Sequence, residues 1–406
     1  MSEEAPPPFP FQDWSCEISP RYRRIRDDPA PARRVVTVTG DRVWLAGRYD
    51  VARRVLADPR MSLSAAMAPG APRQEPILLR TDGARGDVLA TLRDRGLTRV
   101  MRDALGPRAM RRHRPWAYRT AGALIDGLVR GGPVADLYDG LALPLAFATA
   151  GRVLLGEHGE GDRRELDAWC DIVLTFTGHD AGEMNAAVGE IYGFFLRRLP
   201  EMVAGQGCHL VRSLARARGP GGRLTEGELA EAASLFLVAG YRTSASFLGN
   251  ALVTLLRHPG VLAAVGRDPA LVPAAVEELL RYTPMSTGGA KRVATRDVEL
   301  GGMTIGAGEC VLVSLESANR DPRAFAAPEA FAPERFLPGR GTPAHLGLGH
   351  GRHHCPGNRL ARLQLETLLR CLPARLPALR LAVPVEELAW RPGVAFRHPE
   401  AIPARW

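Results

Sequence analysis

The chain has 406 residues, of which 24% are charged and 46% are hydrophobic, and its formal net charge is +9. Lys291 is the only lysine among the 53 basic residues, and this bias to arginine, with abundant Ala, Gly and Pro, indicates codon composition better than a nucleic-acid-binding face. The sequence has no uninterrupted apolar run of about 18 residues and no signal-like beginning, which favours a cytoplasmic protein without a membrane anchor. Its six cysteines form no C-x-x-C pair, a pattern typical of reduced thiols.

The first segments of the chain carry turn and loop signals. Residues 1–15 are rich in proline and predict a flexible lead-in. Residues 62–87 and 178–183 have little apolar periodicity and predict loops. The run Gly-Pro-Gly-Gly at 219–222 predicts a turn.

A long helix is predicted near the middle of the chain, over residues 224–256. Thr225 and Glu228 form a capping pattern, because the Thr hydroxyl and the Glu three residues later can satisfy the first free N–H groups of a helix. The central part reads LFLVAGYRTSASF, in which Thr243 falls one turn beyond Ala239-Gly240 on the same face. A small pair followed by Thr fits ordinary helix packing and a back-bonded hydroxyl as well as a notch for a ligand.

Glu278 and Arg281 lie three residues apart in AAVEELLRYTP and therefore share one face of a predicted helix. Such a pair can be an ordinary surface ion pair, which contributes roughly 0 to 1 kcal/mol. Two further segments follow in the chain, Lys291-Arg292-Val293-Ala294 and then ANRDPRAFAAPEAFAPERF, which contains Arg335.

The glycine-rich loop HLGLGHGRHHCPGNRLAR delivers Cys355 just before a helix predicted to begin at Pro356 or Gly357. Gly349, Gly351 and Gly357 permit close approach of the backbone, and its N–H groups and the helix dipole favour a thiolate in an apolar pocket. An axial thiolate pushes electron density onto a haem iron and favours O–O bond cleavage. Taken alone, a Cys-Pro-Gly triplet also fits a small core cysteine before a helix.

In their order and spacing, these motifs resemble those of the cytochrome P450 family, whose cysteine loop reads F-G-x-G-x-[HR]-x-C-x-G. The resemblance is strongest over residues 239–362 and extends more weakly over nearly the whole chain. It implies one P450 domain over residues 1–406, mainly α with small β-sheets, in which a long distal helix and the proximal cysteine loop sandwich haem b. It also implies a small-molecule substrate and electrons from a ferredoxin and its reductase. The arginine bias and the lack of a long apolar run lead us to expect no nucleic-acid and no membrane partner.

The resemblance implies a role for residues of each motif. Cys355 is expected to be the axial ligand of the haem iron, Thr243 to order the water network at the oxygen site, and Gly240 to make room there. Glu278 and Arg281 are expected to be locked to Arg335. The expected haem contacts are His353, Arg292, Leu348, Gly349 and Gly357, with Leu348 in place of the usual Phe.

Two further parts of the resemblance concern the propionate contacts and the substrate pocket. Most bacterial members use H-x-x-x-R in an early helix, but spacing places Asp94 and Thr98 there, so Arg95 or Arg99 is expected to substitute. The segments expected to line the substrate pocket contribute Ile77, Leu78, Leu79, Met285, Ser286, Thr287, Val394 and Phe396.

Arg242 stands where the family carries an Asp or Glu that relays protons, just before Thr243. A buried guanidinium needs an anion, because stripping a buried ion pair of one partner typically costs about 3–5 kcal/mol. That anion is either a carboxylate of this chain, with Asp167, Asp171 and Glu190 as candidates, or an acidic substrate group, which Arg can bind bidentately. The second alternative resembles the fatty-acid peroxygenases and would make the protein a peroxide-using haem enzyme.

The leading hypothesis is a haem-thiolate monooxygenase that acts on a mid-sized natural product of secondary metabolism. The reaction is hydroxylation or epoxidation, or hydrogen abstraction with coupling or ring closure, which the missing relay acid keeps open. A hypothesis of another class is a catalytically silent haem-binding protein that recruits or senses a partner. The retained Thr243 and Ala239-Gly240 argue against it.

Overall fold

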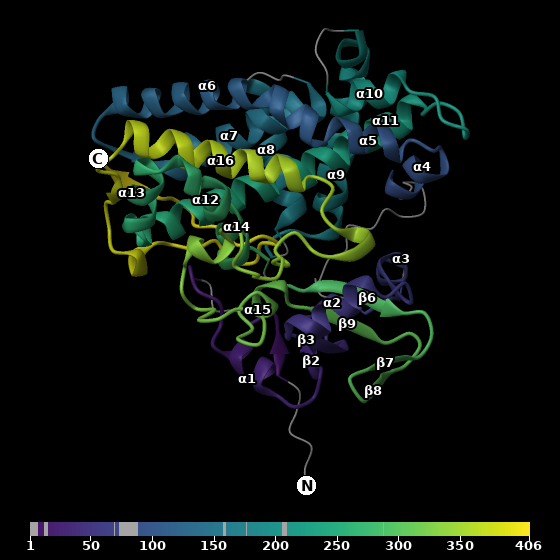
Figure 1. The fold of residues 1–406 in the computed structure, drawn as a ribbon. Helices are drawn as coiled ribbons and strands as arrows, with labels where there is room; N and C mark the ends of the chain where they lie inside the picture. The colour runs from purple at the N-terminus through teal and green to yellow at the C-terminus, as the bar shows by residue number, and fades with distance from the viewer. Residues whose placement is uncertain are drawn as a thin grey trace. The chain divides into compact units, whose positions relative to one another are not determined.

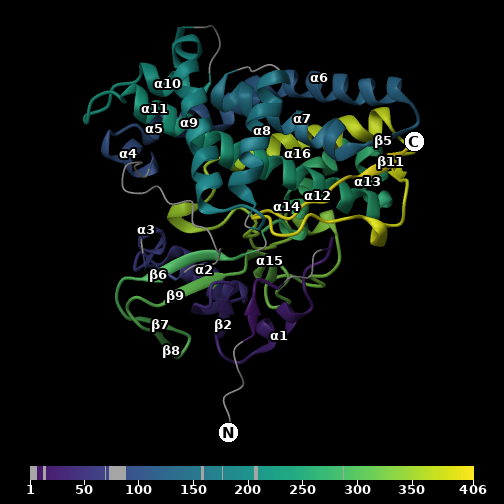
Figure 2. The ribbon, with the colours of Figure 1, turned by 180° about the vertical axis from the view of Figure 1, so that it is seen from behind.

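The computed structural model describes residues 7–11, 15–68, 70–72, 88–156, 160–175, 177–204, 209–286 and 288–406. The chain gathers into two compact units, each made of segments that are distant in sequence (Figures 1 and 2). The first unit comprises Met1–Leu78, Ala270–Cys355 and Trp390–Arg397. The second comprises Leu79–Pro269, Pro356–Ala389 and His398–Trp406.

The first unit is built on a six-stranded sheet. Its strands are β1 (Pro8–Phe9), β2 (Arg33–Thr37), β3 (Arg42–Ala46), β4 (Met61–Ser62), β6 (Ala290–Ala294) and β9 (Cys310–Val313). They lie in the order β1-β2-β3-β9-β6-β4, and the pairs β1–β2 and β3–β9 are parallel whereas the others are antiparallel. A separate hairpin joins β7 (Val298–Leu300) and β8 (Met303–Ile305). The helices of this unit are α1 (Arg21–Asp27), α2 (Tyr49–Ala57), α3 (Leu63–Ala66), α14 (Val272–Tyr282) and α15 (Leu315–Ala318).

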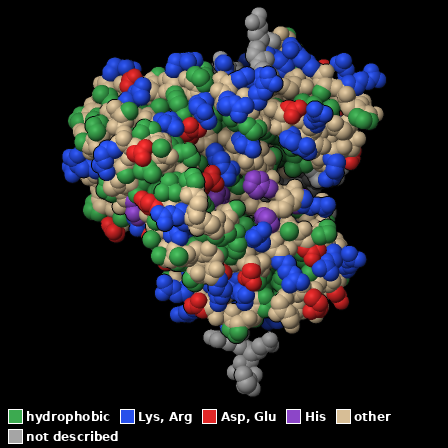
Figure 3. Space-filling model, in the orientation of Figure 1, with side chains coloured by type: hydrophobic (Ala, Val, Ile, Leu, Met, Phe, Trp, Pro, Cys, Tyr) green, Lys and Arg blue, Asp and Glu red, His purple; other side chains and the backbone are tan. Residues whose placement is uncertain are grey.

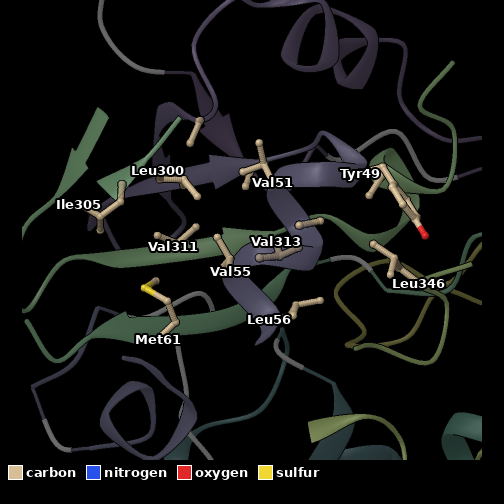
Figure 4. Packing of buried hydrophobic residues seen from close by; sticks show 14 of the residues in the cluster. Tyr49, Val51, Val55, Leu56, Met61, Leu300, Ile305, Val311, Val313 and Leu346 are labelled. Atoms are coloured by element: carbon tan, nitrogen blue, oxygen red, sulfur yellow. The ribbon is translucent and has the colours of Figure 1, made fainter. Parts of the chain in front are cut away.

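Helix α2 packs its apolar stripe on this sheet. Val51, Val55 and Leu56 recur at the spacing of one helical face, and all are buried. They lie against Val311 and Val313 of β9 (Figure 4). Burying one such side chain contributes about 1.5–3 kcal/mol, so this contact stabilises the first unit.

Residues 1–15 were predicted to be a flexible lead-in, and this prediction is wrong for the two residues that pair with the sheet. Pro8 and Phe9 form β1, opposite Val36 and Thr37 of β2. Phe9 is 1% exposed and makes an edge-to-face contact with Phe11 at 5.4 Å. The aromatic side chains outweigh the proline signal, because burying them offsets the entropy lost on ordering the segment.

The second unit is mainly helical. Its α-helices are α4 (Val88–Asp94), α5 (Thr98–Ala104), α6 (Pro107–Gly131), α7 (Leu143–Ala150), α8 (Glu160–Leu174), α9 (Ala181–Ala204), α10 (Leu210–Arg216), α11 (Glu226–Leu237), α12 (Thr243–Arg257), α13 (Pro259–Arg267) and α16 (Asn358–Arg375). Helix α16 runs alongside α6 in both ribbon views (Figures 1 and 2). A three-stranded sheet joins β10 (Arg380–Leu381), β11 (Pro403–Arg405) and β5 (Val134–Asp136).

The predicted long helix is present, but a π-helical turn interrupts it. The capping box predicted at Thr225 and Glu228 is confirmed, since each residue accepts a hydrogen bond from the other's backbone N–H. Helix α11 then runs into the π-helical turn Val238–Arg242, and α12 continues from Thr243. A π-helical turn carries one residue more than an α-turn, and such turns are frequent at functional sites.

The predicted turns and loops meet mixed outcomes. The turn at 219–222 is confirmed by reciprocal backbone hydrogen bonds between Gly219 and Gly222, of 3.1 and 3.0 Å. In the predicted loop 62–87, α3 already covers Leu63–Ala66, and residues 73–87 lie outside the described residues. The predicted loop 178–183 is shorter than expected, because α9 begins at Ala181.

Basic side chains are spread over the surface shown in Figure 3, with acidic and hydrophobic ones between them. Arg108, Arg111 and Arg112 project from α6 and are exposed, whereas Arg114 lies 3.2 Å from Glu366 of α16. This part of α6 is therefore a solvated helix face. Among the described residues, no single helix is long and apolar enough to cross a membrane, and the one candidate pair, Glu226–Arg257 with Pro259–Arg267, is bent by 93°.

Candidate active site

Glu278 and Arg281 form a fully buried ion pair in the first unit. Arg281 donates from Nε and Nη2 to the two carboxylate oxygens of Glu278, each at 2.7 Å. Both side chains are 0% exposed. The alternative of an ordinary surface pair is therefore wrong, and the pair belongs to the class whose loss leaves an uncompensated buried charge.

The segment after α15 closes around this pair. Arg281 donates to the carbonyl oxygens of Asn319, Pro328 and Ala330 at 2.8, 2.8 and 2.9 Å. The Nε of Arg335 lies 3.5 Å from Glu278, in the contact that the sequence led us to expect. One buried carboxylate thus holds two arginines and, through them, a loop that has no regular structure of its own.

The same loop holds the glycine-rich segment before Cys355. The side-chain oxygen of Asn319 accepts a 2.7 Å hydrogen bond from the backbone N–H of Leu346. Gly347 lies so close to the carbonyl oxygen of Leu280 that a Cβ there would overlap it. The cysteine segment is therefore fastened both to α14 and to the loop that α14 organises.

Cys355 ends a tight turn made possible by two glycines. Gly349 and Gly351 have φ of +75° and +72°, which side-chain-bearing residues rarely adopt. The backbone N–H of Cys355 donates to the carbonyl oxygen of Leu348 at 2.9 Å. Helix α16 begins at Asn358, with Gly357 as its N-cap, one residue later than the latest start predicted. The half-buried sulfur therefore precedes the positive end of an 18-residue helix.

On the predicted distal helix, Thr243 is back-bonded. Its hydroxyl donates to the carbonyl oxygen of Ala239 at 2.5 Å, across the π-helical turn. At Gly240, which was expected to make room for a ligand, a Cβ would overlap the side chain of Leu154. That space is filled by a neighbouring segment of the same unit, while Ala239 is exposed.

Arg242 is paired within its own unit. Its Nη1 donates to Asp167 and its Nη2 to Asp171, both at 2.8 Å, and the arginine is 6% exposed. The two carboxylates lie one turn apart on α8, so one guanidinium spans both. Of the three candidate carboxylates, these hydrogen bonds reach Asp167 and Asp171 and do not reach Glu190. The structure therefore shows the first alternative, a carboxylate of the chain as the anion, since both terminal nitrogens of Arg242 donate to chain carboxylates.

The sequence did not point to Tyr241 as part of this network. Its hydroxyl donates to Asp167 at 2.8 Å, and burial raises the pKa of the phenol. Burial alone would lower the pKa of Arg242, but the neighbouring Tyr138 and Asp167 outweigh it and raise that pKa. A tyrosine in an apolar helix gives no sequence signal of its carboxylate partner, which lies 74 residues away.

Known proteins resemble this chain over nearly their whole length. A family model described as Cytochrome P450 matches residues 269–373. Nocardicin C N-oxygenase of Nocardia uniformis subsp. tsuyamanensis is 34% identical, covering 98% of each chain. Cytochrome P450 monooxygenase PikC of Streptomyces venezuelae is 35% identical over 97% of this chain and 92% of its own. The crystal structure of cytochrome P450mel 107F1 with biaryl coupling reactivity has a TM-score of 0.85 and 32% identity, covering 98% of this chain and 99% of that one.

The chain belongs to the cytochrome P450 family. The predicted fold class is confirmed, and the protein is a monooxygenase whose cofactor is haem, iron protoporphyrin IX. As a bacterial P450, it takes a substrate and receives electrons from a redox partner. When bound, the haem supplies the oxygen chemistry, and the protein supplies ligation, orientation and exclusion of water.

Two features of this P450 fit the haem. Cys355 offers a thiolate donor of the kind that the family's iron requires, at a turn that leads into a helix N-terminus. Arg292 is 5% exposed, and its Nη1 donates to the carbonyl oxygen of Lys291 while its Nε has no hydrogen-bond partner among the described residues. Burial lowers the pKa of this guanidinium. A buried cation with an unused donor suits an anionic propionate.

Arg95 and Arg99, the expected propionate contacts of the early helices, have partners within the chain. Arg95 donates to Glu228 at 2.8 Å and to the carbonyl oxygen of Gly221 at 2.7 Å, so it serves the start of α11. Arg99 is 88% exposed on its side chain and lies 3.7 Å from Asp103. Gly96, with a φ of +72°, lies between these two arginines, where α4 has ended and α5 has not yet begun.

The expected pocket-lining residues are only partly described. Ile77, Leu78, Leu79 and Thr287 lie outside the described residues. Ser286 and Phe396 face each other in an isolated antiparallel bridge, and Met285 accepts a 2.8 Å hydrogen bond at its carbonyl oxygen from the N–H of Arg397. Val394 is 4% exposed. Two of the predicted lining segments, which are 110 residues apart at Ser286 and Phe396, are therefore neighbours in the first unit.

Proposed function

We propose that this P450 oxidises a mid-sized natural product of secondary metabolism in the cytoplasm, with electrons from a ferredoxin and a ferredoxin reductase. The names of its relatives support this substrate class, since nocardicin C N-oxygenase is named for a natural product. The observation that carries the proposal is the Cys355 turn, which ends in a half-buried sulfur three residues before α16.

The proposal gives each residue of the proximal segment a task. Cys355 is the axial ligand of the iron. Arg292 and His353 hold the haem propionates, with Leu348, Gly349 and Gly357 shaping the backbone around the sulfur. Buried Glu278, Arg281 and Arg335 keep this segment in place without touching the cofactor.

On the distal side, Arg242 cannot serve as a proton relay. Its pKa is raised above that of a free guanidinium, so it holds its proton throughout the working range of pH. Thr243 is the candidate that holds or passes a proton there, because its hydroxyl can exchange the Ala239 carbonyl for an ordered water. We propose that the Arg242 network fixes the π-helical turn on which Thr243 is mounted.

The reaction type stays open between oxygen insertion and hydrogen abstraction followed by coupling or ring closure. The solved relative with biaryl coupling reactivity supports the second possibility for a chain of this kind. The two outcomes differ in the product, because coupling leaves no added oxygen atom. The residues that we propose to line the substrate pocket are Met285, Ser286, Thr287, Val394 and Phe396, together with Ile77, Leu78 and Leu79.

The test begins with the purified protein loaded with haem and reduced under carbon monoxide. We expect the red-shifted Soret band of thiolate ligation in the native chain and in Cys371→Ala, a control in the buried part of α16. Cys355→Ser should lose that band, and a band that persists in this variant would refute the assignment. A screen of peptidyl and polyketide ligands for displacement of the iron-bound water would then supply a substrate. Haem loading without ligand-dependent electron consumption would favour the silent recruitment protein instead.

A further inference from the structure

A second buried ion pair lies where the two proposed lining segments of the first unit meet. Arg397 donates from Nη2 to Glu316 of α15 at 3.3 Å, and the two side chains are 5% and 9% exposed. The residues are 81 positions apart, and no sequence motif singles out either. The pair needs an explanation, because burying two charges costs free energy that only further hydrogen bonds offset.

Those further hydrogen bonds go to the lining segments. The other carboxylate oxygen of Glu316 accepts a 2.6 Å hydrogen bond from the backbone N–H of Met285. The backbone N–H of Arg397 donates to the carbonyl oxygen of Met285 at 2.8 Å, next to the bridge between Ser286 and Phe396. The Glu316 carboxylate thus binds the backbone of one lining segment at Met285. It also binds the side chain of Arg397, the residue that follows the other lining segment.

Arg397 is also anchored to the N-terminal part of the unit. Its Nη1 donates to the carbonyl oxygens of Ser15 and Glu17, at 3.1 and 2.7 Å. The guanidinium therefore joins three stretches of chain that no regular element holds together. Moving either lining segment would break a buried charge-assisted hydrogen bond.

We propose that Glu316 and Arg397 are positioning residues that determine substrate specificity, by fixing Met285 and Phe396 relative to each other. The inference rests on the proposed function, since it takes these two segments as pocket walls. Neither charged side chain needs to touch the substrate. The pair fixes how the two neighbouring segments lie against each other, and thereby the shape of the wall that a ligand meets.

The test compares the binding of a small and a bulky azole, imidazole and clotrimazole, to the haem-loaded protein by their spectral shifts. Glu316→Gln keeps the shape of the side chain but removes the charge that holds Arg397. We expect the ratio of the two dissociation constants to change by about tenfold or more, the effect of about 1.4 kcal/mol, with imidazole binding unchanged. A pair that is merely structural would lower thermal stability and leave this ratio alone.

Glu309→Gln is the matched control. Glu309 also accepts a backbone N–H, from Gly306 at 2.8 Å, and pairs with an arginine, but that arginine is Arg34 of β2 rather than a residue of a lining segment. The ratio of the two azole dissociation constants in Glu309→Gln should equal that of the native protein. If Glu316→Gln does not fold, the double variant Glu316→Gln/Arg397→Gln removes both charges and leaves no unpaired ion.

The outcomes separate the two proposals. An altered ratio with an intact thiolate spectrum, together with faster amide hydrogen exchange over residues 284–289 and 394–398, supports the positioning role. If Glu316→Gln and the double variant both keep the native ratio of the two azole dissociation constants, with the thiolate spectrum intact, the positioning role is overturned and the proposed function stands. Absence of the thiolate spectrum in the native protein overturns the proposed function itself.

Discussion

Glu278 receives both arms of the Arg281 guanidinium at 2.7 Å, and the N–H of Ala332 shares one of the same oxygens at 2.8 Å. The pair itself is local, three residues apart on α14, but the carbonyls that complete Arg281 come from a loop 38 to 49 residues further on. The arrangement of that loop, and of the cysteine segment fastened to it, therefore depends on one carboxylate.

Replacing Glu278 with Gln should destabilise the protein by about 3–5 kcal/mol, because two arginines lose the charge that compensates them in the interior. Urea unfolding would measure the loss, and haem content after purification should fall with it. Glu277→Gln serves as the control. Glu277 is the neighbouring carboxylate, 30% exposed, whose partner is His345 at 3.0 Å. Equal stability of the two variants would contradict this account of the buried pair.

Arg242→Gln should cost roughly 1.5–3 kcal/mol, the range of hydrogen bonds to charged groups. The cost is smaller than for a fully buried pair, because the side chains of Asp167 and Asp171 are each 24% exposed. The variant leaves Asp167 and Asp171 close together without their cation, so Asp171→Asn in the same background should restore part of the loss. Affinity for an acidic ligand relative to its methyl ester should not change, because Arg242 holds chain carboxylates. A lost preference for the acid would instead revive the substrate-carboxylate alternative. Glu190→Gln is the control for a distant carboxylate.

Gly240→Ala should destabilise the π-helical turn although alanine is the better helix former. The gain from helix propensity is at most about 1 kcal/mol, whereas overpacking against Leu154 typically costs about 1–3 kcal/mol. Leu154→Ala alone opens a cavity, but combined with Gly240→Ala it should recover stability. Thermal unfolding of the native protein, the two single variants and the double variant gives the coupling free energy between the side chains at positions 240 and 154. Additive effects would show that the two side chains do not meet.

The capping box of α11 should make stability depend on pH. Burial raises the pKa of Glu228, but the N–H of Thr225 and the guanidinium of Arg95 lower it further, so the folded pKa lies below 4.5. A lowered folded pKa means that the stabilisation is fully present above 4.5 and is lost as pH falls through the folded value. The stability difference between the native protein and Glu228→Gln should therefore be largest at neutral pH and shrink in acid, as urea unfolding at several pH values would record. A constant difference would exclude the charge as its source.

Local features of this P450 could be predicted from the sequence, and features that depend on distant partners could not. The cap at Thr225, the turn at 219–222 and the long mid-chain helix depend on residues within one turn of each other. The contact of Arg335 with Glu278 bridges 57 positions and was accessible only through the family's motif order.

The failures share one physical cause. The sequence could not show that Leu154, 86 residues earlier, lies against Gly240, or that Glu228, 133 residues later, pairs with Arg95. Phe9 was placed in a flexible lead-in for the same reason, since β2 buries it. Periodicity and spacing describe one helix or strand at a time. The burial and the partners of these side chains depend on a second segment of the chain.

Lys291 has a consequence for handling the protein. The only side-chain amine of the chain is 8% exposed, and its Nζ donates to the carbonyl oxygen of Pro72 at 3.2 Å. Reagents that acylate lysine will therefore leave the arginine-borne surface charge intact, and amine-directed crosslinking cannot report which surface a redox partner touches. Covalent capture of that partner has to start from the carboxylates or from cysteines introduced at chosen positions.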